Sequence, residues 1–258
     1  MSKLAYVIAG NTISFVYENK PYMINKSNAK FDQIAAALKA GDHEEALKLA
    51  DVVSRIKEYV KGDIKLVNNT LTYRGNSINN TLTKRIITMM NEGHDVDAMI
   101  SFMSNLMENP SHAAVMELYD FLEKTNLPIT PDGCFLAYKK VRSDFKDIYT
   151  GTVDNSVGKT VFQERNAVDD DRRNHCSNGL HFCSISYLDH YGSCNSKDMR
   201  ILMVKINPKN VVSIPTDYNF AKGRCCEYEV LADITDTYTE VESKGSVQTG
   251  YFAAAESV

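Results

Sequence analysis

The side chains best suited to chemistry are concentrated between Cys176 and Gly192, where the chain reads CSNGLHFCSISYLDHYG. This segment joins a glycine, a strand-like run LHFC and a short helix opened by Ser184, and it carries imidazole, hydroxyl and aromatic groups. Such groups beside the end of a strand are typical of the wall of a binding cleft. A core strand followed by a capping turn accounts for the same pattern. If the protein has a site, we expect it along His181–Tyr191.

The tripeptide Gly158-Lys159-Thr160 belongs to a nucleotide-binding P-loop only if another glycine stands five residues before Gly158. Val153 occupies that position, and Gly151 lies two residues too early. A branched side chain where the backbone needs a positive φ disrupts a phosphate-binding nest. The tripeptide therefore predicts a turn that leads into a strand.

Metal ligands are present but are not spaced as in a compact site. Asp169–Asp171 point in different directions and are followed by two arginines, which favours a solvated loop. The soft ligands available for zinc are His175, Cys176, Cys183, Cys194, Cys225 and Cys226. They include no C-x-x-C pair, so we predict buried or half-buried thiols and no metal, with structural zinc as the alternative. A Cys-His nucleophile has equally weak support.

The elements that must position these groups begin with a hairpin and two helices. Apolar and polar residues alternate over 12–24, as in a hairpin with one buried face. Helical periodicity follows. Gly41 ends the first helix, and Asp42 with Glu45 forms a capping pair that opens a second helix. We expect this helical hairpin to close near Gly62.

Short strands and three further helices are predicted next. The strands are 64–67 and 71–73. Gly93 ends the first of the three helices, Asp95 can cap the second, and Ser111 can cap the third. Methionines occur at near-helical spacings in this region, at Met89, Met90, Met99, Met103, Met107 and Met116. We interpret them as an adaptable core, and a partner-binding groove is the alternative.

Two prolines and a glycine within 127–133 mark the best domain boundary. The pattern then changes to runs of strand length at 134–141, 199–206, 211–214 and 225–234, with a short helix at 185–190. We predict an α+β protein with a hairpin and helical domain at 1–128, a strand-rich domain at 129–238 and a tail at 239–258.

Composition and charge exclude several classes of protein. The 258 residues carry 29 Lys+Arg and 33 Asp+Glu, so the formal net charge is −4 and gives no general attraction to nucleic acid. No run approaches the roughly 20 apolar residues that span a bilayer, and the first residues lack the apolar core of a signal peptide. We therefore expect reduced thiols in a cytoplasm and no direct nucleic-acid contact.

Several long and unusual strings, in register from about residue 13 to 235, resemble the rIIB family of T-even phages. They are ENPS at 108–111, DFLEKTNLPITPDGCFLAYKKVRS at 120–143, DNSVGK at 154–159, VDDD at 168–171, CSNGLHFCSISYLDHYGS at 176–193 and VVSIPTDYNFAKGRCCEYEV at 211–230. Because these strings occur in the same order, the resemblance is far more specific than any single short motif.

The resemblance implies a non-enzymatic, early phage accessory protein. It would act with a larger rIIA-like partner, in the host cytoplasm or peripherally on the inner membrane. Its role would be to protect the infected cell from prophage-triggered early lysis and exclusion and to counter host defence. A homo-oligomer stays open.

A second resemblance concerns the strand-rich domain. Residues 179–182, Ser186, Tyr191 and Glu227 resemble elements of the ADP-ribosyltransferase fold, in which Tyr191 would stack nicotinamide and Glu227 would hold a ribose hydroxyl. His181 stands where that family has tyrosine, and Tyr138-Lys139 replaces its His-Gly pair. Because likeness of fold does not carry function, transferase activity is not expected.

These observations leave a second functional hypothesis beside the accessory role, a nucleotide- or NAD-binding module with a degenerate site. Its candidate ligand-binding residues are His181, Ser186, Tyr191, Glu227 and Tyr138. Arg142 or Arg224 would pair with an anion. No catalytic or metal-binding residue and no obligatory cofactor is predicted.

Overall fold

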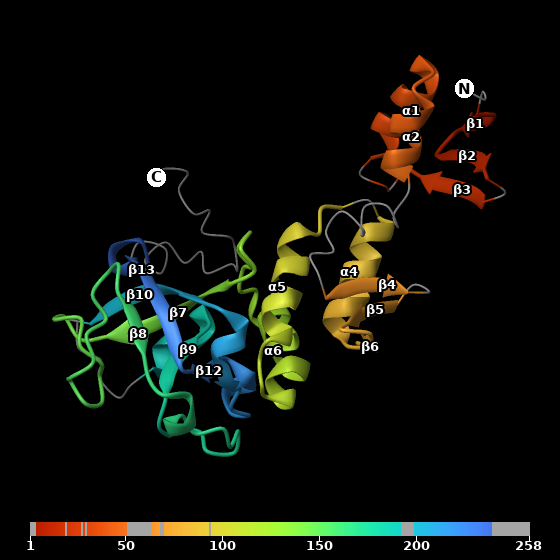
Figure 1. Ribbon diagram of the computed structural model, residues 1–258. Helices are drawn as coiled ribbons and strands as arrows, with labels where there is room; N and C mark the ends of the chain where they lie inside the picture. Colours follow the sequence, from red (N-terminus) through yellow and green to blue (C-terminus); the bar gives the residue numbers. More distant parts are fainter. Residues whose placement is uncertain are drawn as a thin grey trace. The chain divides into compact units, whose positions relative to one another are not determined.

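The structure is a computed structural model that describes residues 4–238, except 19, 27, 29, 51–62, 68, 69, 93 and 192–198. It contains helices and antiparallel sheets, so the fold is α+β, as predicted (Figure 1). The chain divides into two compact units, residues 1–104 and 105–258. The predicted tail at 239–258 and the end of the helical hairpin near Gly62 lie outside the described residues.

The first unit begins with a three-stranded sheet and two helices. The elements are β1 (Tyr6–Ala9), β2 (Thr12–Tyr17), β3 (Lys20–Asn25), α1 (Phe31–Ala40) and α2 (His43–Ala50). Strand β1 was not predicted, but the hairpin, the end of the first helix at Gly41 and the start of the second at Asp42 are confirmed. Gly41 takes a left-handed φ of 77° to end α1, and the carboxylate of Asp42 accepts the Glu45 amide at 3.1 Å.

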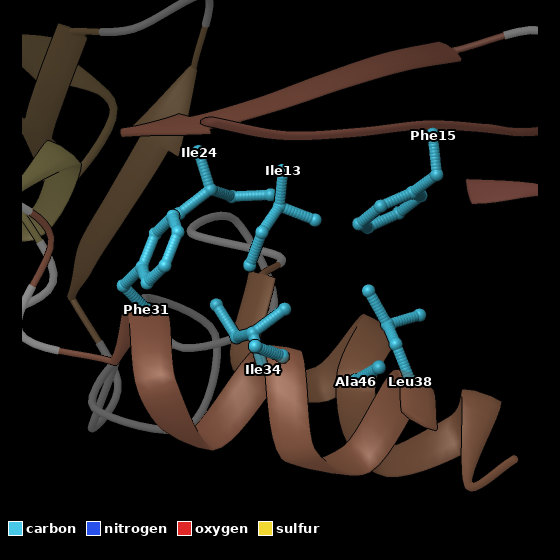
Figure 2. Close-up of a cluster of buried hydrophobic side chains, with 8 residues drawn as sticks. Ile13, Phe15, Ile24, Phe31, Ile34, Leu38 and Ala46 are labelled. Carbon is cyan, nitrogen blue, oxygen red and sulfur yellow. The ribbon is translucent and has the colours of Figure 1, made fainter. Parts of the chain in front are cut away.

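One hydrophobic cluster holds this sheet to its helices. Alternate residues of β2 and β3 point towards α1, whose apolar residues recur at helical spacing (Figure 2). The buried members are Ile13, Phe15, Ile24, Phe31, Ile34, Ala35, Leu38 and Ala46. The helices that contribute to this cluster lie against one face of the sheet and do not cover the other face.

The rest of the first unit comprises a small sheet and helices. These are β4 (Ile64–Val67), β5 (Thr70–Tyr73), β6 (Asn76–Ser77), α4 (Thr81–Asn91) and α5 (Asp97–Met107), which crosses the division between the units. Asn80 and Thr83 form a reciprocal capping box at the start of α4. Met90 and Met103 are buried, as a methionine core requires, whereas Met116 is 41% exposed.

The second unit is built on a seven-stranded sheet with the order β11-β12-β9-β7-β10-β13-β8. Every strand pair in it is antiparallel. The elements are α6 (His112–Thr125), β7 (Phe135–Val141), β8 (Thr160–Phe162), β9 (Leu180–Cys183), β10 (Arg200–Ile206), β11 (Val211–Ser213), β12 (Lys222–Cys225) and β13 (Glu227–Asp233). Short 3₁₀ helices are η1 (Arg165–Ala167), η2 (Ile185–His190), η3 (Pro208–Asn210) and η4 (Tyr218–Phe220).

Helix α6 packs against this sheet, although it precedes the boundary that we predicted at 128/129. The Phe121 ring of α6 meets the Phe182 ring of β9 edge to face at 5.9 Å. Before the helix, the side chain of Asn109 donates to the carbonyls of Pro208 and Val211, both at 2.8 Å. These contacts place α6 in the same compact unit as the strands, while the domain boundary at 128/129 stays a prediction.

Candidate functional site

The second unit contains a pocket of about 450 Å³, which is within the usual range for small-molecule sites. Strands β7, β9 and β13 contribute to its lining, together with residues 147–153 and 176–179. The lining residues are Lys139, Lys140, Asp147, Ile148, Tyr149, Thr150, Val153, Gln163, Cys176, Ser177, Asn178, Gly179, Leu180, His181, Tyr191 and Tyr228. A smaller pocket shares Tyr149, Cys176, His181 and Tyr191 with it.

Lys139 is the buried cation of this pocket, with 6% of the residue exposed. Its ammonium donates to the His181 carbonyl at 3.0 Å and to the Tyr191 hydroxyl at 3.3 Å. It also lies 5.9 Å from the ring centre of Tyr191 and 5.4 Å from that of Tyr228. Burial lowers the pKa of Lys139 to about 8, against the smaller opposing effects of Cys225, Cys183 and Asp147. The group still carries a positive charge at neutral pH.

Neighbouring basic side chains are held by protein oxygens. The ammonium of Lys222 lies 2.7 Å from the Asp217 carboxylate and 3.2 Å from the Tyr187 hydroxyl. Arg224 is fully buried and donates to the carbonyls of Asp169, Asp171 and Asn174 and to the Ser213 hydroxyl. These hydrogen bonds attach loop 169–174 to β12, and they engage all three nitrogens of the guanidinium.

His181 is an uncharged imidazole in the same pocket. Burial is the main cause that lowers its pKa to about 3, and the charges of Lys139, Arg224 and Lys222 act in the same direction. At neutral pH the ring therefore offers one donor and one acceptor and no charge.

The carboxylate of Asp147 organises loop 147–153 at the rim. It accepts the Thr150 hydroxyl and amide, both at 2.6 Å, and the amides of Thr152 and Val153 at 3.0 and 2.9 Å. Burial by itself would raise the pKa of Asp147, but these hydrogen bonds outweigh it and hold the pKa well below the ordinary range. Because its acceptor positions are occupied, this carboxylate acts as a structural group.

The pocket residue Tyr228 is held by the buried side-chain amide of Asn155. Its hydroxyl donates to the side-chain oxygen of Asn155, whose own amide donates to the carbonyls of Phe145 and Val153 at 3.2 and 2.9 Å. Burial raises the pKa of Tyr228 well above 10, so the phenol stays neutral. Its ring is a rigid part of the wall.

Of the five candidate residues, His181 and Tyr191 line the pocket and the other three do not. Tyr138 is buried outside the pocket lining, although its neighbour Lys139 lines the pocket. Ser186 is exposed on η2, and its hydroxyl lies 2.9 Å from that of Ser184. The carboxylate of Glu227 accepts the Asn210 side-chain amide at 3.0 Å, and its neighbour Tyr228 faces the pocket instead.

Neither of the two predicted anion partners lines the pocket. The guanidinium of Arg224 donates its hydrogen bonds to loop 169–174 and Ser213. Arg142 donates to the Ile148 carbonyl at 2.9 Å and lies against Gly151. Lys139 is the buried cation that faces the pocket, and it is not among the site residues predicted from the sequence. The signal that could have found it is a lysine inside the apolar strand run FLAYKKV, where a charge is unexpected.

The structure also shows the predicted turn at Gly158 and the environment of the cysteine thiols. Gly158 has a φ of 84° and precedes β8, as the predicted turn into a strand requires. In the described part of the chain, no three His, Cys, Asp or Glu side chains gather as a metal site, and Cys194 lies outside it. Cys134, Cys183, Cys225 and Cys226 are buried thiols, and Cys176 is exposed.

Two comparisons match this chain and one does not. The family model described as bacteriophage T4 protein rIIB matches residues 3–239. Protein rIIB of Enterobacteria phage T4 is 41% identical over 212 residues, which cover 82% of this chain and 67% of that protein. No solved structure matches, so the predicted likeness to the ADP-ribosyltransferase fold is without support. No helix in the described residues has the length and apolar character that crossing a bilayer requires.

Proposed function

The chain belongs to the family of bacteriophage T4 protein rIIB, and on that premise we propose that it is a phage accessory protein acting with an rIIA-like partner. In this proposal the pair prevents prophage-triggered early lysis and exclusion and counters host defence. It works in the host cytoplasm or peripherally at the inner membrane. The match over residues 3–239 is the observation that carries the proposal.

The proposed role is non-enzymatic, since rIIB is not a known enzyme family. The pocket holds one group with a pKa of about 8, the buried Lys139, but its carboxylate and its imidazole support the non-enzymatic role. Its described carboxylate, Asp147, is bound by loop donors, and its imidazole, His181, is uncharged at neutral pH. A general acid or base needs a pKa near the working pH and a free proton-transfer position. We expect the protein to act through its surfaces.

An apolar patch on the outer face of the β1–β3 sheet supports a protein partner. Val7 pairs with Ser14 and Ser14 pairs with Met23, so these residues form a row across the three strands. Val16 lies two residues further along β2 on the same face. Val7, Val16 and Met23 are 62%, 61% and 76% exposed. Exposed apolar side chains that share one face of a sheet suit a protein contact.

We expect the chain, tagged and expressed during infection, to co-purify with an rIIA-like phage protein. The double variant Val16→Lys, Met23→Lys should lose at least about nine tenths of the partner, because a charge buried in an apolar contact is costly. Quantitative mass spectrometry of the purified complexes measures the loss.

Val157→Lys is the matched control, because Val157 is an exposed valine of the second unit. It should retain the partner. Recovery of the wild-type chain alone from every cell fraction would contradict the proposed partnership. If the double variant recovers as much of the partner as the wild-type chain does, the patch is not the partner-binding surface. Deletion of the gene should also change plaque formation on a lysogen, and an unchanged plaque would contradict the role in early lysis.

A further inference from the structure

The environment of Lys139 differs from that of Lys222, another buried lysine. Lys222 is neutralised by Asp217 at 2.7 Å, whereas no carboxylate in the described residues forms an ion pair with Lys139. Lys139 has three N–H donors, of which the described protein atoms take two. A buried ammonium without a counter-ion is unfavourable unless an anion reaches it. The pocket of about 450 Å³ opens onto this group.

The remaining lining suits a flat ring beside an anion. Tyr149 is 67% exposed and faces the same pocket as the buried Tyr191 and Tyr228. Aromatic faces stack on planar heterocycles in a way that tolerates the identity of the ring. Lys140 adds a second positive charge to the lining, and the single negative charge of Asp147 is directed into its own loop. Polar edges come from Asn178 and the neutral His181.

We propose that this pocket binds a nucleoside monophosphate, with the phosphate on Lys139 and the base against Tyr149. The phosphate supplies the counter-ion that Lys139 lacks, and the third N–H of the ammonium donates to it. This proposal goes beyond the accessory role, because it gives the protein a binding site for a small molecule. That site is separate from the apolar patch of the first unit.

Calorimetry with the full chain and AMP, adenosine and inorganic phosphate tests the assignment. We expect AMP to bind at one site and each of its two parts alone to bind at least about tenfold more weakly. Lys139→Met keeps the apolar stem and removes the charge, and it should weaken AMP binding about 10- to 100-fold. Lys205→Met is the matched control, because Lys205 pairs with Asp132 and Glu229 and does not line the pocket.

Two further measurements do not depend on the folding of the Lys139 variant. Tyr149→Ala removes an exposed ring and should weaken AMP binding about fivefold or more while leaving phosphate binding unchanged. AMP should also slow the alkylation of Cys176, the exposed thiol in the lining, as followed by peptide mass spectrometry. Absence of AMP binding at millimolar concentration overturns the assignment. So does AMP binding that Tyr149→Ala leaves unchanged and that does not protect Cys176.

Discussion

Lys139 and His181 face the same pocket, and burial lowers the pKa of both, yet they differ in charge at neutral pH. The pKa of Lys139 falls to about 8 and leaves the ammonium protonated, whereas the pKa of His181 falls to about 3 and leaves the imidazole neutral. The difference comes from the ordinary values, which are about 10.4 for lysine and about 6.5 for histidine. The pocket therefore holds a positive charge beside a neutral hydrogen-bonding ring.

The lowered pKa of His181 makes part of the folding free energy depend on pH. The unfolded chain binds a proton at this residue below its ordinary pKa of 6.5, and the folded chain does so only near 3. Stability from this residue is thus complete above pH 6.5 and is lost as the pH falls from 6.5 towards 3. Replacing His181 by Gln removes this dependence.

We predict that the free energy of unfolding of wild type, relative to His181→Gln, falls by about 3 kcal/mol between pH 7 and pH 4. Urea unfolding at both pH values measures the difference, and contributions from the carboxylates cancel between the two proteins. His175→Gln is the control, because His175 is an exposed histidine. A constant difference between wild type and His181→Gln would show that His181 titrates normally.

Strand β12 contains a glycine, Gly223, that lies under the aromatic ring of Phe182. Gly223 pairs with Phe182 of β9, and a Cβ at residue 223 would lie 2.2 Å from the tip of the Phe182 ring. That ring also meets Phe121 of α6 and Phe135 of β7 edge to face. The glycine makes room for the ring that joins the helix to the sheet.

Gly223→Ala should therefore lower the free energy of unfolding by about 1–3 kcal/mol through overpacking. In the double variant with Phe182→Leu the alanine should cost measurably less, because the tip of the ring is gone. Chemical unfolding of the four proteins in this cycle gives the coupling energy. Additive effects of the two substitutions would mean that a clash with the Phe182 ring is not the reason why alanine at residue 223 is destabilising.

The whole chain consists of two compact units, each with its own buried side chains. In the first unit the cluster around Ile34 and Leu38 joins helices to the β1–β3 sheet. In the second unit the sheet carries the pocket, and every residue that lines it comes from 139–228. Ligand binding and the apolar patch are thus assigned to different units.

A fragment of residues 95–238, which retains all of α5, should fold without the first unit and bind AMP within about threefold of the full-length affinity. It should fail to retain the rIIA-like partner, because the apolar patch is absent. Cooperative unfolding with intact near-ultraviolet circular dichroism, followed by calorimetry, measures the first expectation. A fragment that lacks fixed tertiary structure would show that the second unit needs the first.

Local patterns in the sequence were sufficient for the α+β class, the first hairpin, the helix starts at Asp42 and Ser111, and the family. These features depend on neighbouring residues, such as alternation along a strand or a capping side chain three residues before an amide. Strand β12 was only partly anticipated, because Lys222, Gly223 and Arg224 resemble a loop until Asp217 and the carbonyls of loop 169–174 satisfy their charges.

The tertiary structure alone decided which candidates share a pocket. The sequence placed Tyr138 and Glu227 in the site, but their neighbours Lys139 and Tyr228 line the pocket instead. Which face of a strand lines a cavity depends on pairing with strands distant in the chain, here β9 and β10 on either side of β7. Among the residues that the structure describes, that pairing leaves Lys139 buried without an ion pair to a carboxylate, because long-range packing rather than local spacing fixes the partners of a buried charge.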